Sequence, residues 1–163
     1  MAKKNYDKFP LSLAMCDARP VIFFSISMIL IGINFKNDVF MIGAVCCTLA
    51  GLLKVIWKII IAATRKDIAI LNRQMRFVMP IGFLLIIIGV IMGAGSIDVS
   101  SLLGKITSFP SILFFVITII GMALMMLFAF KLDGTKRSSN WIEQITNAIA
   151  QGCLLLGIIS VMG

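Results

Sequence analysis

Residues 39–63 have the sequence VFMIGAVCCTLAGLLKVIWKIIIAA, and residues 64–76, which follow, have the sequence TRKDIAILNRQMR. The first segment is long enough to cross the apolar core of a bilayer as a helix, which takes about 20 mainly apolar residues. The second segment carries four of the 15 basic residues of the chain. An apolar run followed by a basic connection is typical of a polytopic membrane protein.

The same alternation recurs along the chain, of whose 163 residues 60% are hydrophobic and only 13% are charged. This composition leaves too little polar surface for a water-soluble domain. The five apolar runs are 20–35, 39–63, 77–96, 109–130 and 142–162. We therefore predict an all-α fold, with residues 1–19 as a cytoplasmic N-terminal leader and residues 20–163 as a five-helix transmembrane domain.

The first run is shorter than the other four, at about 24 Å for a rise of about 1.5 Å per residue. Three explanations are compatible with a span of this length. The helix begins earlier than Pro20, the bilayer thins around it, or the helix leans on its neighbours.

Orientation follows from the basic residues, which are retained on the cytoplasmic side of membrane proteins. Thirteen of the 15 fall in alternate connections, and only Lys36 and Lys105 fall in the others. The thirteen are Lys3, Lys4, Lys8, Arg19, Lys54, Lys58, Arg65, Lys66, Arg73, Arg76, Lys131, Lys136 and Arg137. This split predicts an inner or plasma membrane protein with a cytoplasmic N-terminus and an outside C-terminus. Because topology explains the net charge of +8, we expect no nucleic-acid partner.

Helix starts are expected where proline and capping residues stand. Pro20 and Pro110 suit the first turns of the first and fourth spans. At Pro80 the third span either begins or continues through a kink from a cytoplasmic helix. Asn140, with Glu143 three residues later, fits a capping box at the start of the fifth span.

The two longest connections, residues 64–76 and 97–108, are about as long as the longest ordinary loops. In the first of them, Ile68, Ile70, Leu71 and Met75 recur between charges. An interfacial helix is therefore expected there, whereas residues 97–108 are expected to form a loop.

Small residues at helical spacing mark the expected contacts between helices, because helices in lipid associate where two backbones can approach closely. The candidates in the second, third and fifth spans are Gly43, Cys47, Gly51, Gly89, Gly93, Ala148 and Gly152. Packing within one five-helix bundle is the favoured interpretation. A subunit interface is the alternative, and it requires one of these faces to point away from the chain's own helices.

Polar side chains inside the spans form two groups. Gln144, Asn147 and Gln151 share one face of the fifth span, where they bond to a neighbouring helix, bond to a partner subunit or line a pore. Lys54 and Lys58 lie one turn apart and are expected to extend to the lipid headgroups, or to contact an anion or a lipid phosphate. Asp17 and Arg19 are expected to form a surface ion pair at the entry to the first span.

Enzyme chemistry is not indicated, because the seven carboxylates are dispersed, histidine is absent, and no nucleophile, metal or nucleotide motif occurs. We therefore expect no catalytic residues, no cofactor and no metal. The pattern favours a small integral subunit of a larger membrane assembly, such as secretion or transport machinery. Its expected partners are the lipid bilayer and other membrane protein subunits or copies of itself. The alternative is a small homo-oligomeric channel or carrier lined by the polar face of the fifth span.

Overall fold

The computed structural model describes residues 11–64, 66, 68–96, 98–132 and 137–163. Within these residues the fold is all-helical, and five helical segments are long and apolar enough to cross a membrane, as predicted. The long helices are α1 (Leu11–Phe35), α2 (Asp38–Thr64), α4 (Met75–Gly93), α6 (Ser111–Lys131) and α7 (Arg137–Met162). The predicted leader residues 1–10 lie outside the described residues, as do the basic residues Arg65 and Lys136.

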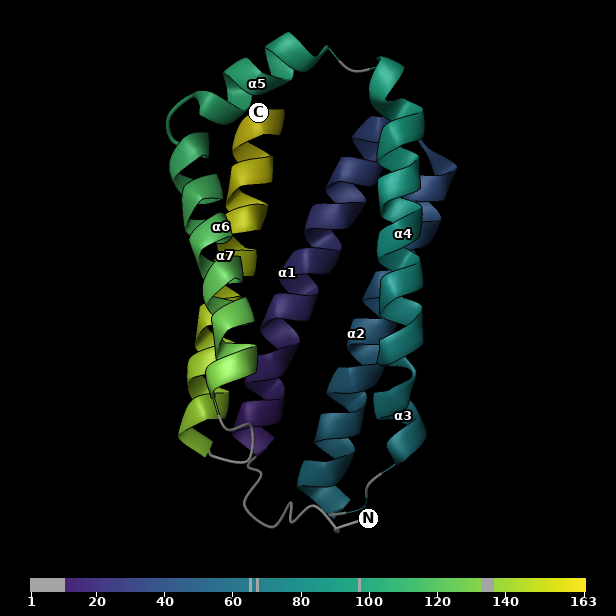
Figure 1. Ribbon diagram of the computed structural model, residues 1–163, viewed down its shortest axis with the longest axis vertical. Helices are drawn as coiled ribbons and strands as arrows, with labels where there is room; N and C mark the ends of the chain where they lie inside the picture. The colour runs from purple at the N-terminus through teal and green to yellow at the C-terminus, as the bar shows by residue number, and fades with distance from the viewer. Residues whose placement is uncertain (1–10, 65, 67, 97, 133–136) are drawn as a thin grey trace.

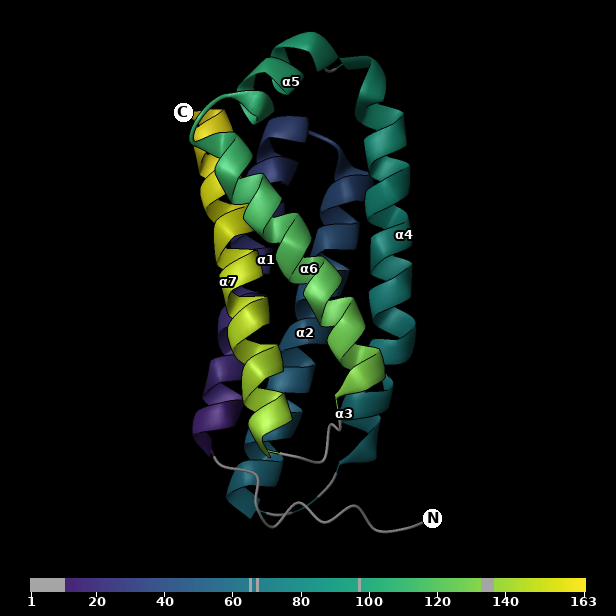
Figure 2. The ribbon, with the colours of Figure 1, turned by 60° about the vertical axis from the view of Figure 1, so that its left-hand side comes forward.

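The long helices form an open row (Figure 1). α4 packs on α2, α2 on α1, α1 on α7, and α7 on α6. α1 therefore makes the main packing contact between the α2/α4 pair and the α6/α7 pair. Each of the two outer helices, α4 and α6, packs most extensively on one other long helix, and α4 also contacts α1 through the Phe83 and Phe24 rings. α6 crosses the molecule at an angle (Figure 2).

The first helix begins at Leu11, nine residues before the predicted start at Pro20. Pro20 therefore lies inside the helix. The physical reason is tertiary packing, because Ala14, Cys16 and Asp17 are buried against the other helices and hold the chain helical ahead of the proline. With 25 residues, α1 is about 37 Å long, and an early start is the explanation that applies to the short first run.

One further helix start differs from expectation in a similar way, and at Pro80 one of the two expected alternatives is found. α7 begins at Arg137, so Asn140 lies in its first turn and is not the N-cap. α4 begins at Met75 and contains Pro80, so of the two alternatives at Pro80 the structure has the one in which the helix continues through the proline. The short helix α3 (Ala69–Arg73) precedes it, in the connection where an interfacial helix was expected. The Gln74 side chain joins this region to α2 by donating from Nε2 to the Ala50 carbonyl at 3.1 Å.

The connection at residues 97–108 is a helix and not the expected loop. After the 3₁₀ turn η1 (Ala94–Ser96), α5 (Val99–Thr107) lies across one end of the row (Figure 1). Asp98 caps it by accepting hydrogen bonds from the backbone N–H groups of Ser100 and Ser101. The Ser100 hydroxyl and the Ser101 N–H also hold the pKa of the Asp98 carboxyl below its usual value. Val99, Leu102, Leu103 and Ile106 share one face of α5, at the spacing of an amphipathic helix.

Glycine allows α2 and α4 to approach most closely. A Cβ atom added at Gly89 would lie 2.5 Å from the Phe40 backbone nitrogen, and one at Gly43 would lie 2.7 Å from the Gly82 carbonyl oxygen. Both contacts are with backbone, which cannot rotate away. The Cys47 Sγ atom lies at the same contact, 3.8 Å from the Met79 carbonyl oxygen. These positions therefore require small residues for the two helices to touch.

Candidate functional site

Charged side chains meet at one end of the row. Asp17 lies six residues from the start of α1, Lys58 six residues from the end of α2, and Glu143 six residues from the start of α7. Because these helix ends lie together (Figure 1), the three groups stand at a similar height, about 9 Å along their helices. The described basic residues Lys66, Arg73, Arg76 and Lys131 belong to the same end.

Lys58 and Asp17 form an ion pair between α2 and α1. The Lys58 Nζ lies 2.6 Å from the Asp17 Oδ2, and the two side chains are only 13% and 10% exposed. The expectation of a surface ion pair between Asp17 and Arg19 is therefore wrong. Lys58 also turns toward the bundle and not toward the headgroups, so the anion that it contacts is a carboxylate of its own chain. Removal of either partner would leave the other charge buried.

Lys54 lies one turn before Lys58 on α2, about 15 Å from the end of the helix, and is half-buried. Its ammonium group interacts electrostatically with Lys58, Asp17 and Glu143. Two lysines and two carboxylates from three helices, α1, α2 and α7, therefore lie near one another, with Lys58 and Asp17 in ion-pair contact. We call these four residues the charged cluster.

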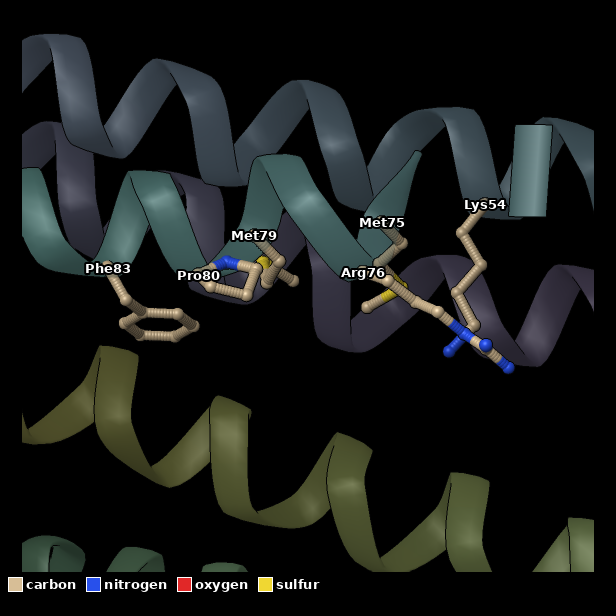
Figure 3. Close-up of a pocket in the computed structure, with 6 residues that line it drawn as sticks. All are labelled: Lys54, Met75, Arg76, Met79, Pro80 and Phe83. Carbon is tan, nitrogen blue, oxygen red and sulfur yellow. The ribbon is translucent and has the colours of Figure 1, made fainter. Parts of the chain in front are cut away.

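An open groove begins beside the charged cluster. It has a volume of about 420 Å³ and is lined by Lys54 of α2 and by five residues of α4, namely Met75, Arg76, Met79, Pro80 and Phe83. In Figure 3 the side chains of Lys54 and Arg76 extend to one end of the groove, while Pro80 and Phe83 lie toward the other. The Phe83 ring also packs on Phe24 of α1, with the ring centres 6.1 Å apart.

The amide face of α7 points into the molecule. Gln144 and Gln151 are buried, and Asn147 is half-buried. The Gln151 Nε2 lies 3.4 Å from the Met122 Sδ of α6. A second contact joins α7 to α6, because the Thr118 hydroxyl of α6 donates a hydrogen bond to the Ala150 carbonyl of α7 at 3.2 Å. The amide oxygens of Gln144 and Gln151 have no hydrogen-bond partner among the described residues.

The small residues singled out in the sequence lie mostly against helices of the same chain. Gly43 and Cys47 face α4, and Gly89 faces Phe40 of α2. The remaining contacts involve α1: Gly51 meets Val21, Gly93 meets the Phe35 ring, and Gly152 meets the Phe23 ring. Ala148 is half-buried on α7.

The ion pair and the groove escaped the sequence analysis, although a signal for the pair exists. Asp17 and Lys58 are opposite charges near the same predicted membrane face, each close to an apolar run. Arg76 gives no such signal, because its place beside Lys54 depends on how α4 packs against α2.

The charged cluster has no arrangement typical of catalysis or metal binding. Among the described residues, no group of three or more His, Cys, Asp or Glu side chains is placed to hold a metal ion. What the cluster and the groove offer is a buried ionic contact between helices and a cationic end to an apolar surface. Comparison of this chain with known proteins finds no matching family model, no similar curated protein and no similar solved structure.

Proposed function

We propose that this protein is a small, non-enzymatic integral subunit of a larger assembly in the inner or plasma membrane, such as secretion or transport machinery. The observation that supports the proposal is the open row of helices. α4 and α6 stand at its two ends, and each leaves most of its circumference free of other long helices of the chain. A shape of this kind offers two long helix faces to neighbouring membrane proteins.

Both outer faces are continuous and apolar. On α4, the exposed residues at helical spacing are Phe77, Ile81, Leu84, Ile88 and Ile91. On α6, they are Ile112, Val116, Ile119, Met126 and Phe130. Helices of other subunits can pack along either stripe by van der Waals contact.

The rival proposal, a channel lined by Gln144, Asn147 and Gln151, has less support. A pore needs its lining residues on a surface that water can reach. Gln144 and Gln151 are only 7% and 8% exposed, and Gln151 lies against Met122. Lining a pore with this face would require α7 to separate from α6.

A photo-crosslinking experiment tests the subunit proposal. A photoreactive side chain at Ile88 of α4 or Ile119 of α6 is expected to link the protein to other membrane proteins in intact membranes. The same side chain at Ile61, which is 1% exposed, is the matched control and is expected to give no intermolecular product. Products are identified by mass spectrometry after purification in mild detergent.

Two results would contradict the subunit proposal. The first is crosslinking only to lipid or to a second copy of the chain from both outer helices. The second is a reproducible ion or solute flux through liposomes that contain the purified protein, altered by Asn147→Leu. That flux would support the channel instead.

Membrane orientation has its own test. From the 13 to 2 distribution of basic residues, reporter fusions at Lys4, Lys66 and Lys136 are expected to report a cytoplasmic location. Fusions at Asn37, Asp98 and Gly163 are expected to report an outside location. Paired reporters, one active only in the cytoplasm and one active only outside, provide the internal control. An outside location for Lys66 would contradict the proposed orientation, since its connection carries the densest basic charge.

A further inference from the structure

The groove between α2 and α4 combines two different chemistries along its length. Lys54 and Arg76 supply two cations at one end (Figure 3). Met79, Pro80 and Phe83 supply an apolar wall that follows. Arg76 and Phe83 are seven residues apart on α4, so the wall extends about 10 Å from the cationic end.

Among the described residues, the positive charge near the groove is only partly compensated. In the part of the chain that the structure describes, the one ion pair joins Lys58 to Asp17. Glu143 lies within electrostatic range of Lys54, but not at ion-pair distance. The groove and the charged cluster together thus contain three described cations, Lys54, Lys58 and Arg76, and two described carboxylates, Asp17 and Glu143. A cation that is partly buried, as Lys54 is, is stabilised by a nearby anion.

We infer that the groove binds an anionic phospholipid, with its headgroup phosphate between Lys54 and Arg76 and one acyl chain along Met79, Pro80 and Phe83. A phosphate bound by two basic side chains matches the charge at the cationic end. The apolar wall directly beside it matches the start of an acyl chain. The groove is shallow and open along its length, so an acyl chain can lie in it from the side.

The position of the groove in the fold agrees with this occupant. Arg76 is the second residue of α4, at the end of the row where the basic residues gather. If the five helices cross the membrane as proposed, this end lies at the headgroups of the cytoplasmic leaflet and the apolar wall lies in the acyl region. The inference rests on the membrane placement in the proposed function, but it does not depend on the existence of partner subunits.

Native mass spectrometry of the full chain in mild detergent tests the site. Phosphatidylglycerol and phosphatidylcholine are titrated separately, and the wild type is expected to prefer phosphatidylglycerol. The double variant Lys54→Gln/Arg76→Gln is expected to bind phosphatidylglycerol about 10- to 30-fold more weakly and to lose the preference. Arg73→Gln is the matched control, because Arg73 is a nearby exposed arginine that does not line the groove. It is expected to bind like the wild type.

Two further arms identify the part of the ligand that is recognised. Met79→Ser is expected to weaken the binding of both lipids and to keep the preference for phosphatidylglycerol, because this substitution changes only the apolar wall. Inorganic phosphate at the lipid concentration is expected not to displace phosphatidylglycerol. Displacement by phosphate alone would overturn the lipid inference in favour of a soluble anion.

Equal affinity of the wild type and the double variant for phosphatidylglycerol would contradict the proposed site. A loss of affinity in Arg73→Gln as large as that in the double variant would also contradict it. If the double variant does not fold, as judged by circular dichroism, the single variant Arg76→Gln replaces it, since Arg76 is exposed. That variant is expected to lose about fivefold in affinity for phosphatidylglycerol. Failure to crosslink partner proteins would leave these lipid results unaffected, so the two proposals fail separately.

Discussion

Lys58→Met is expected to lower the free energy of unfolding by about 3 kcal/mol, because it leaves the Asp17 carboxylate buried without its cation. The ion pair is the shortest polar contact between α1 and α2 that the structure describes, and both side chains are largely buried. Unfolding in mixed micelles by titration with a denaturing detergent, followed by circular dichroism, measures the change.

Two further variants distinguish the loss of the ion pair from a general effect of losing a charge. Asp17→Asn/Lys58→Met, which removes both charges, is expected to recover much of the lost stability, since no uncompensated ion remains. Lys54→Met removes a lysine one turn away that makes no ion pair, and a smaller loss is expected. Equal stabilities of Lys58→Met and the wild type would show that the pair does not hold α1 to α2.

Gly89→Leu is expected to destabilise the fold by about 1–3 kcal/mol, because even a Cβ at this position would lie 2.5 Å from the Phe40 backbone nitrogen. The neighbouring atoms belong to the α2 backbone, so α4 must move away as a whole. Gly93→Leu is expected to cost less, since the atoms near Gly93 belong to the Phe35 ring, which can rotate. The same unfolding experiment in micelles ranks the variants.

Gly104→Leu is the control for the Gly89 prediction. No atom lies within 4 Å of a Cβ added at Gly104, which is exposed on α5. It is expected to leave stability nearly unchanged. A loss at Gly104 as large as that at Gly89 would mean that a larger side chain, and not the approach of two helices, causes the effect.

The five long apolar helices could be predicted from the sequence, because an apolar run of membrane length in a chain without strand patterning can satisfy its backbone as a helix. The order of the helices in the row could not. Nearly all sides of these helices are apolar, so periodicity does not show which side contacts a neighbour. Small residues come closest to such a signal. Gly43 and Gly89 lie at the α2/α4 contact, but Gly51 and Gly93 meet α1, and their spacing does not distinguish the two cases.

Local signals misplaced two helix starts. Pro20 and Asn140 are residues that commonly stand at helix N-termini, yet both lie inside longer helices. In α1, burial of Ala14 and Asp17 outweighs the local preference. The opposite error occurred at α5, where Asp98 and the apolar positions 99, 102, 103 and 106 carry a helix signal that the length of the connection obscured.

The candidate site was predicted only in fragments. Lys54 and Lys58 can be recognised in the sequence as cations within an apolar run. The sequence does not show that Lys58 pairs with Asp17 or that Lys54 lines a groove with Arg76. Those relationships depend on how α1 and α4 pack against α2 across long sequence separations.

The position of α5 means that the two ends of the row are held together in different ways. α5 follows α4 and η1 in the chain and packs on α6 and α7. It therefore connects the two outer helices at one end (Figure 2). At the basic end, no connection of the chain runs directly from α4 to α6. At that end the two pairs are held together through α1, which packs on both α2 and α7 and carries the Asp17 carboxylate paired with Lys58.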